Sequence, residues 1–89
     1  MNWPTTIDDA VKVVINTLTP DQRNDIRNLP KDDLISLHHS VGQWIRNEFG
    51  LWKGNFKLAD ACGVVPFDAD EASAVIIEKV WEELKKNEE

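Results

Sequence analysis

The fold is decided by residues 31–49, which read KDDLISLHHSVGQWIRNEF. Apolar side chains recur there every three or four residues, the spacing that places them on one face of an α-helix. This stripe consists of Leu34, Leu37, Val41, Ile45 and Phe49, with Ile35 and Trp44 beside it. The segment therefore predicts one long amphipathic helix over residues 31–49, which Gly50 can end by adopting a left-handed conformation.

Capping residues and apolar spacing predict four further helices, at residues 6–18, 20–28, 55–62 and 69–86. Thr6 and Asp68 can cap the first and the last of these, and Thr19-Pro20-Asp21-Gln22 has the pattern of a capping box. No alternation typical of a strand occurs. We therefore expect the all-α class, a compact bundle of about five helices, three long and two short, forming a single domain over residues 1–89.

Length and charge limit the partners that this chain can have. Its 89 residues leave room for one core and little space for an enclosed active site. Its net charge of −6 falls entirely on residues 58–89, and such a field repels nucleic acid and acidic membranes. We therefore expect the chain to bind a protein partner and to bind neither nucleic acid nor membranes. We expect it to be a monomer or a weak homodimer. A lone cysteine, a start without a signal-peptide pattern and the lack of a long apolar run indicate the cytoplasm.

Motifs for catalysis or metal binding are missing from the sequence, which has no glycine-rich phosphate loop, no G-x-S-x-G and no H-E-x-x-H. His38 and His39 are adjacent, so on a helix they diverge by ~100° and are poorly placed to share a metal ion. Cys62 stands at a predicted helix end, where the dipole disfavours a thiolate, and it is interpreted as a small apolar residue. We expect no catalytic residue, no cofactor and no metal.

His38 falls in the middle of the apolar stripe, so its ring is expected to point inward. Gly42 follows one turn later, although a glycine inside a helix costs about 1 kcal/mol relative to alanine. Such a glycine is usually kept because another helix or a large side chain lies against it. The simplest interpretation is a buried neutral histidine beside a close helix crossing, and a ligand-binding or proton-transfer role is the alternative.

Polar residues gather with aromatic ones around the end of the predicted 31–49 helix. The candidate interaction or ligand patch consists of His38, Arg46, Asn47, Trp52 and Asn55. Arg46 could stack on Trp52 or pair with a carboxylate, and Asn55 could cap the next helix. These residues either fix the corner or form an aromatic–arginine hot spot on the surface. We expect Arg46 to be mainly structural and Trp52 to be partly exposed.

The same stretch resembles a small bacterial domain family of unknown function, with the signature His-x3-Gly-x2-Ile-Arg-Asn-x-Phe-Gly-Leu-Trp-x-Gly-Asn. Here the signature runs from His38 to Asn55. Trp3-Pro4 near the start and the segment 72–81 are similar as well, so the likeness covers nearly the whole chain. The resemblance implies a bacterial helical domain, free-standing or appended, and it implies no activity, cofactor or ligand.

Two functions fit these observations. The leading hypothesis is a non-enzymatic protein-interaction or regulatory module, because catalytic motifs are missing and the large aromatic residues exceed what so small a core must hide. The alternative is a small ligand-binding or enzymatic domain with a pocket around His38, Arg46 and Asn47. In that pocket Arg46 would bind an anion and His38 would move a proton. An open cleft at these side chains favours the pocket, whereas buried and mutually bonded side chains favour the module.

Overall fold

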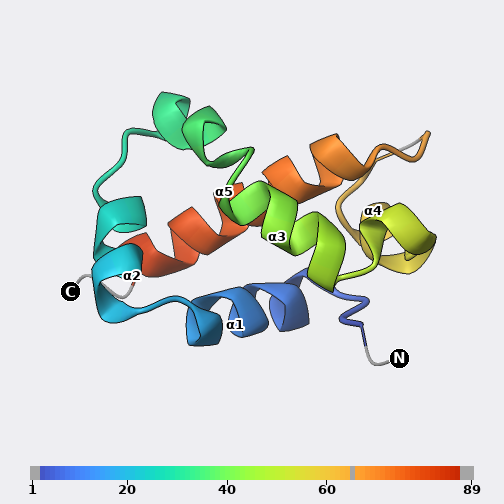
Figure 1. The fold of residues 1–89 in the computed structure, drawn as a ribbon, viewed down its shortest axis with the longest axis horizontal. Helices are drawn as coiled ribbons and strands as arrows, with labels where there is room; N and C mark the ends of the chain where they lie inside the picture. Colours follow the sequence, from blue (N-terminus) through green and yellow to red (C-terminus); the bar gives the residue numbers. More distant parts are fainter. Residues whose placement is uncertain (1–2, 65, 87–89) are drawn as a thin grey trace.

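Helix α5 (Ala69–Lys86) is the element against which the others pack (Figure 1). The computed structural model describes residues 3–64 and 66–86, and within these ranges it contains helices and no strand. The other elements are α1 (Ile7–Thr17), α2 (Pro20–Arg27), the 3-10 helix η1 (Lys31–Leu37), α3 (Val41–Glu48), the 3-10 helix η2 (Leu51–Lys53) and α4 (Phe56–Ala61). Each of these contacts α5, and the predicted all-α class is confirmed.

Helix starts follow the capping chemistry expected from the sequence. Thr6 Oγ1 accepts a hydrogen bond from the N–H of Asp9 at 3.2 Å. Thr19 and Gln22 form a complete capping box, in which each side chain accepts from the backbone N–H of the other residue. These bonds satisfy N–H groups that a first helical turn leaves free. The predicted bounds of α1, α2, α4 and α5 accordingly agree with the structure to within one residue at each end.

The core lies between α5 and the helices that cover it. Its largest fully buried apolar side chains are Ile45, Leu51, Leu58, Ile76, Leu84, Val14 and Val80. Val13, which the helical period places off the apolar face of α1, is exposed as expected. Among the described residues, no helix has both the length and the apolar character needed to cross a membrane.

The prediction of one continuous helix over residues 31–49 is wrong. Its first part is the 3-10 helix η1, a turn follows at residues 38–40, and its second part is α3. The N–H groups of His38 and Ser40 bond to carbonyl groups three residues earlier, at 3.1 and 3.2 Å, which is the 3-10 pattern. As a result, η1 forms an arch above the other helices in Figure 1 and does not extend α3.

The 3-10 geometry also decides which side chains of η1 face the body. Leu34 is buried and Leu37 is half-buried, whereas Ile35, expected beside the stripe, is 72% exposed. Side chains three residues apart eclipse one another in a 3-10 helix. The Leu34–Leu37 spacing therefore suits a 3-10 helix as well as an α-helix, and apolar spacing alone does not distinguish the two.

Candidate functional site

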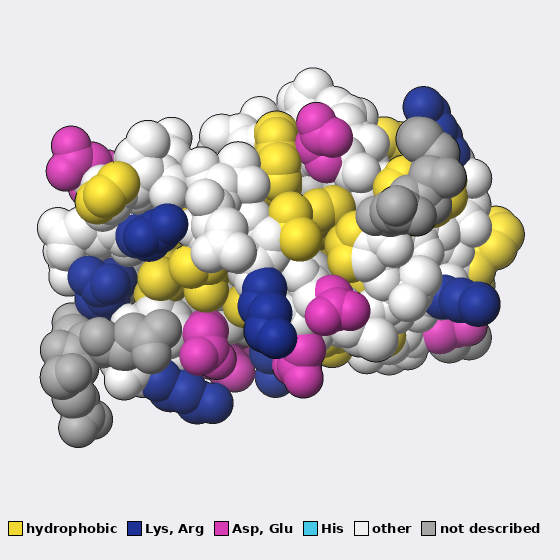
Figure 2. All heavy atoms as spheres, turned by 90° about the horizontal axis from the view of Figure 1, so that it is seen from below, with side chains coloured by type: hydrophobic (Ala, Val, Ile, Leu, Met, Phe, Trp, Pro, Cys, Tyr) yellow, Lys and Arg dark blue, Asp and Glu magenta, His cyan; other side chains and the backbone are white. Residues whose placement is uncertain are grey.

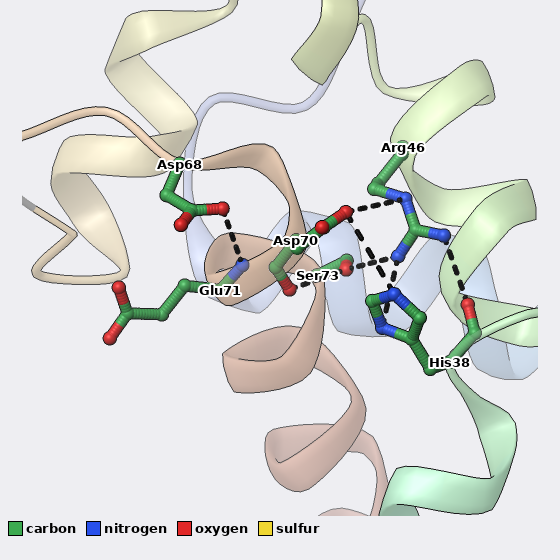
Figure 3. A network of polar contacts seen from close by, with 6 residues as sticks. All are labelled: His38, Arg46, Asp68, Asp70, Glu71 and Ser73. Atoms are coloured by element: carbon green, nitrogen blue, oxygen red, sulfur yellow. Dashed lines mark hydrogen bonds and ion pairs between the residues drawn. The ribbon is translucent and has the colours of Figure 1, made fainter.

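Arg46 is the centre of a buried polar network (Figure 3). Its side chain, on α3, is 5% exposed. Nη1 donates to Ser73 Oγ on α5 at 2.9 Å, and Nη2 donates to the backbone carbonyl of His38 at 3.0 Å. A Cβ at Gly42 would lie 3.1 Å from Arg46 Nη1 and 3.4 Å from Ile77 Cδ1 of α5. The expectation that a large side chain and a second helix lie against this glycine is confirmed.

The turn at residues 38–40 makes this network possible. In a continuous α-helix the carbonyl of His38 would accept from the N–H of Gly42. The turn releases that carbonyl from the helical pattern, and Arg46 donates to it. The break in the predicted helix and the bonding of the arginine are therefore two parts of one arrangement.

Asp70 and the His38 ring complete the network on its solvent side. Asp70 Oδ1 lies 3.4 Å from Arg46 Nε and 3.9 Å from His38 Nε2 (Figure 3). Within the described part of the chain Arg46 Nε has no hydrogen-bond acceptor, so its contact with Asp70 is an ion pair without hydrogen-bond geometry. Arg46 Nη1 lies 3.5 Å from His38 Nδ1, which can accept only in the neutral tautomer that carries its proton on Nε2.

His38 therefore faces charged groups, although the sequence placed its ring in the apolar stripe. Its side chain is 25% exposed and lies between Arg46 and Asp70. It also lines a groove of about 290 Å³ between η1 and α5, and Arg46 and Asn47 are not among the residues that line this groove. The exposed His39 stacks edge-to-face on His38, with ring centroids 4.9 Å apart.

Ser73 and Asp70 are parts of this network that the sequence analysis missed. Ser73 is fully buried on the face of α5 that also buries Ala72, Ile76 and Ile77. A hydroxyl in the middle of an apolar face needs a hydrogen-bond partner. The position of Ser73 on this face was therefore the sign in the sequence that a polar network lies here. The Ser73 hydroxyl accepts from Arg46 and donates to the carbonyl of Asp70 at 2.9 Å. In Figure 3, Asp68 accepts from the N–H of Glu71 at the start of the same helix, as its capping role predicts.

The Trp52 ring lies next to the Arg46 guanidinium. Arg46 Cζ is 5.8 Å from the centroid of the Trp52 ring, within the range of a cation–π contact. Trp52 is nevertheless 58% exposed, as expected for this loop residue. Phe56 of α4 is 59% exposed, and its ring meets that of the exposed Phe67 edge-to-face at a centroid distance of 5.0 Å. Three large aromatic side chains are thus exposed: Phe56 and Phe67, which contact each other, and Trp52 on η2, which packs against α4.

The other two candidate residues lie apart from the Arg46 network. Asn55 is buried and caps α4 as expected, accepting from the N–H of Leu58 at 3.4 Å. Its amide group donates to the carbonyls of Pro4 at 3.0 Å and Phe49 at 2.7 Å, which ties the N-terminal residues to this corner. Asn47 is exposed on the surface of α3.

Cys62 is half-buried at the end of α4, where its Sγ lies 3.7 Å from the carbonyl oxygen of Ala72. Burial raises the pKa of the Cys62 thiol from 9.0 to about 11, so at neutral pH it is a thiol and a poor nucleophile. Within residues 3–64 and 66–86, no group of three His, Cys, Asp or Glu side chains is placed to hold a metal ion.

Arg46 therefore joins α3, the 38–40 turn and α5, and its charge is already opposed by Asp70. Such a group can bind a ligand anion only after these bonds are broken.

Searches among curated proteins and among solved structures each gave no match to this chain. A family model, the Domain of unknown function (DUF6794), matches residues 3–84, and the chain therefore belongs to that family.

Proposed function

We propose that this domain is a non-enzymatic protein-interaction module whose contact surface is the aromatic surface formed by Trp52, Phe56 and Phe67. The observation that carries the proposal is the exposure of these three large side chains, two of them in mutual contact and the third on η2, which packs against α4. Buried aromatic anchors dominate the binding energy of many protein interfaces, and exposed aromatic side chains are the source of such anchors.

Restraint of the three rings supports this proposal. The Arg46 guanidinium lies against Trp52, and Phe56 and Phe67 contact each other. A side chain held in place before binding loses less conformational entropy when a partner covers it. The aromatic surface is therefore prepared for binding.

The alternative, a ligand pocket around His38, Arg46 and Asn47, is weaker. Arg46 is buried and bonded to Ser73 and to the His38 carbonyl, and Asn47 lies on the outer surface. A pocket would need an Arg46 group free to meet an anion. Because Arg46 is bonded within the chain and Asn47 is not part of its network, the module is the better supported of the two functions.

The test compares proteins captured from an extract of the source cells by the immobilised wild-type domain and by the variant Trp52→Ala/Phe56→Ala. We expect the variant to lose at least one specifically enriched protein while keeping its helical far-UV spectrum, because both side chains are exposed. Ile35→Ala is the control, since it removes a large apolar side chain that is even more exposed, 72%, from η1. Identical capture by all three proteins contradicts the proposal.

A further inference from the structure

Two lysines border the aromatic surface. Lys53 directly follows Trp52 and Lys57 directly follows Phe56, and all four side chains are exposed. The Phe56 ring lies 3.6 Å from where a Cβ would stand on Gly54, the residue after Lys53, so it packs against the end of η2. Basic side chains and aromatic rings therefore alternate along one short exposed segment.

Most of the ten basic side chains are engaged by other groups of the molecule. They form ion pairs, donate to backbone carbonyls or lie over a ring, and they are Arg23, Arg27, Lys31, Arg46, Lys79, Lys85 and Lys86. Lys12, Lys53 and Lys57 make none of these contacts with the residues that the structure describes. Lys12 is on α1, where it lines the groove between α1 and α5. Two of the three uncommitted cations therefore stand next to exposed aromatic rings.

Acidic residues near the aromatic surface leave the charge of these lysines in place. Residues 49–59 contain no Asp or Glu. Asp68, which follows Phe67, accepts a backbone N–H at the positive start of α5. Asp60 lies one turn after Phe56 on α4, is exposed, and forms no ion pair with the described residues. The edge of the surface that carries the two lysines is therefore basic, although the chain as a whole is acidic.

The acids of the second half of α5 do not cancel this local charge. Glu78, Glu82 and Glu83 each pair with a lysine, and the first of them lies about 12 Å beyond Asp70 along the helix axis. The Debye length is only about 8 Å at physiological salt. Figure 2 keeps the α4 end of the molecule at the right, and there dark blue basic side chains lie beside yellow hydrophobic ones. A partner that covers the aromatic surface therefore meets mainly rings and uncommitted positive charge.

We propose that the aromatic surface binds an acidic segment of a partner protein, in which apolar side chains are flanked by Asp or Glu. This inference rests on the proposed function and names the chemistry of the partner. The apolar side chains of the segment cover Trp52 and Phe56, and its carboxylates pair with Lys53 and Lys57. Single-stranded nucleic acid also stacks on aromatic rings, but it needs a basic groove that follows many phosphates. Two lysines on a chain of net charge −6 do not supply such a groove.

The experiment uses two synthetic peptides of about 12 residues, long enough to span about 40 Å when extended. They share the same Leu and Phe residues, and the residues between these are Asp and Glu in one peptide and Lys in the other. An oligothymidine of about 12 nucleotides is the third probe. Binding to the full chain is measured by calorimetry at low and high salt and mapped by amide and Trp52 indole shifts in NMR spectra. We expect the acidic peptide to bind at least about fivefold more tightly than the basic one, with a smaller difference at high salt and with shifts centred on residues 51–57.

Two double variants test the role of the lysines without disturbing the fold. Lys53→Gln/Lys57→Gln removes both charges of the basic edge, and it should weaken binding of the acidic peptide about fivefold. Lys12→Gln/Lys86→Gln is the matched control, because it makes the same change in net charge at exposed positions of α1 and α5. It should leave the affinity unchanged, and both variants should keep the far-UV spectrum of the wild-type chain.

Several results overturn the inference: equal affinity for both peptides, equal effects of the two double variants, shifts away from the aromatic surface, tighter binding of the oligothymidine, self-association of the chain through this surface, or no binding at all. Capture from cell extract then shows whether the proposed function fails as well. If Trp52→Ala/Phe56→Ala loses a protein that Lys53→Gln/Lys57→Gln still captures, the surface binds a partner of different chemistry and only this inference fails. Capture that does not depend on Trp52 and Phe56 contradicts the proposed function itself.

Discussion

At the scale of single residues, Arg46 shows how one buried charge can be kept in so small a domain. Its guanidinium donates to a hydroxyl on α5 and to a carbonyl released by the 38–40 turn, while Asp70 opposes its charge. Hydrogen bonds that involve a charged group contribute about 1.5–3 kcal/mol each. The network therefore offsets part of the cost of burying the arginine and joins three parts of the chain.

Replacing Arg46 should accordingly destabilise the whole domain. Arg46→Ala is expected to lower the free energy of unfolding by about 3 kcal/mol, because it removes the donors to Ser73 and to the His38 carbonyl. Arg46→Lys should lose about 2 kcal/mol, since an ammonium group lacks the planar fork that reaches both acceptors. Urea denaturation followed by far-UV circular dichroism measures both, with exposed Lys53→Ala as a control expected to stay within about 0.5 kcal/mol. Equal midpoints for all four proteins would show that the network is not structural.

The Cys62 thiol makes a second prediction, on reactivity and pH. Because burial raises its pKa to about 11, iodoacetamide at pH 8 should alkylate the native protein much more slowly than the urea-unfolded chain. The pKa of the thiol is near 9.0 in the unfolded chain and about 11 in the folded protein, so the folded state holds this proton more firmly. The contribution of the protonated thiol to the free energy of unfolding is therefore complete below pH 9 and is lost as the pH rises to 11. Cys62→Ala should show a shallower loss of stability over that window. Rapid alkylation of the native protein at pH 8 contradicts the assignment.

At the scale of elements, the corner between α3 and α4 depends on how closely the N-terminal residues approach it. Gly50 and Gly63 both have positive φ, 67° and 76°, so alanine is strained at either position. Only at Gly50 would a Cβ also overlap a side chain, the ring of Trp3, whereas nothing lies within 4 Å of one at Gly63. The two glycines form a matched pair: alanine would strain the backbone at both, but only at Gly50 would it also overlap a side chain.

Gly63→Ala should therefore lower the free energy of unfolding by about 1 kcal/mol through backbone strain. Gly50→Ala should lower it by about 2 kcal/mol or more. If the excess comes from Trp3, the substitution Gly50→Ala should cost about the same as Gly63→Ala when both are made in a Trp3→Ala background. Thermal and urea unfolding of the single and double variants measure this coupling. An excess that persists without Trp3 would locate the strain elsewhere.

The elements also show what the sequence can and cannot predict. Thr6, Thr19 and Gln22 bond within three residues of themselves, so their local pattern predicts where α1 and α2 begin. The break after η1 is accompanied by a bond between the His38 carbonyl and an arginine eight residues later. No local periodicity reports such a bond, and Leu34 and Leu37 fit either helix type.

In the candidate site, too, the features that depend on nearby residues were predictable and those that depend on long-range packing were not. A structural role for Arg46 was expected from its position beside the apolar stripe, and partial exposure of Trp52 from its place after a C-capping glycine. Asn47 lies one residue further round α3 and points away, so adjacency in sequence did not bring it into the network. Ser73 and Asp70 lie 27 and 24 positions from Arg46, and only the packing of α3 on α5 joins them to it.

At the scale of the whole molecule, the central position of α5 predicts that the fold is one cooperative unit. It contacts each of the other described helices, and its buried side chains run from Ala69 to Leu84. The two ends of α5 hold different parts of the chain: Trp81 donates to the Leu29 carbonyl at 2.9 Å, while Asp70 meets Arg46. Neither end has a core of its own that excludes α5, so neither should remain folded when the other is lost.

This predicts that damage at opposite ends has the same consequence. Leu84→Ala, beside α2, and Leu51→Ala, in η2, should each lower the free energy of unfolding by about 3 kcal/mol, because both side chains are almost completely buried. Tryptophan fluorescence should be recorded in two backgrounds that each keep one of the four tryptophans. In Trp3→Phe/Trp44→Phe/Trp52→Phe only Trp81 remains and reports on the α2 end, and in Trp3→Phe/Trp44→Phe/Trp81→Phe only Trp52 remains and reports on the η2 end. The two fluorescence transitions and the far-UV transition should coincide for both leucine variants, since α5 has to leave every element at once. A variant whose local tryptophan signal changes at lower urea than its helical signal would show instead that α5 joins two units that unfold separately.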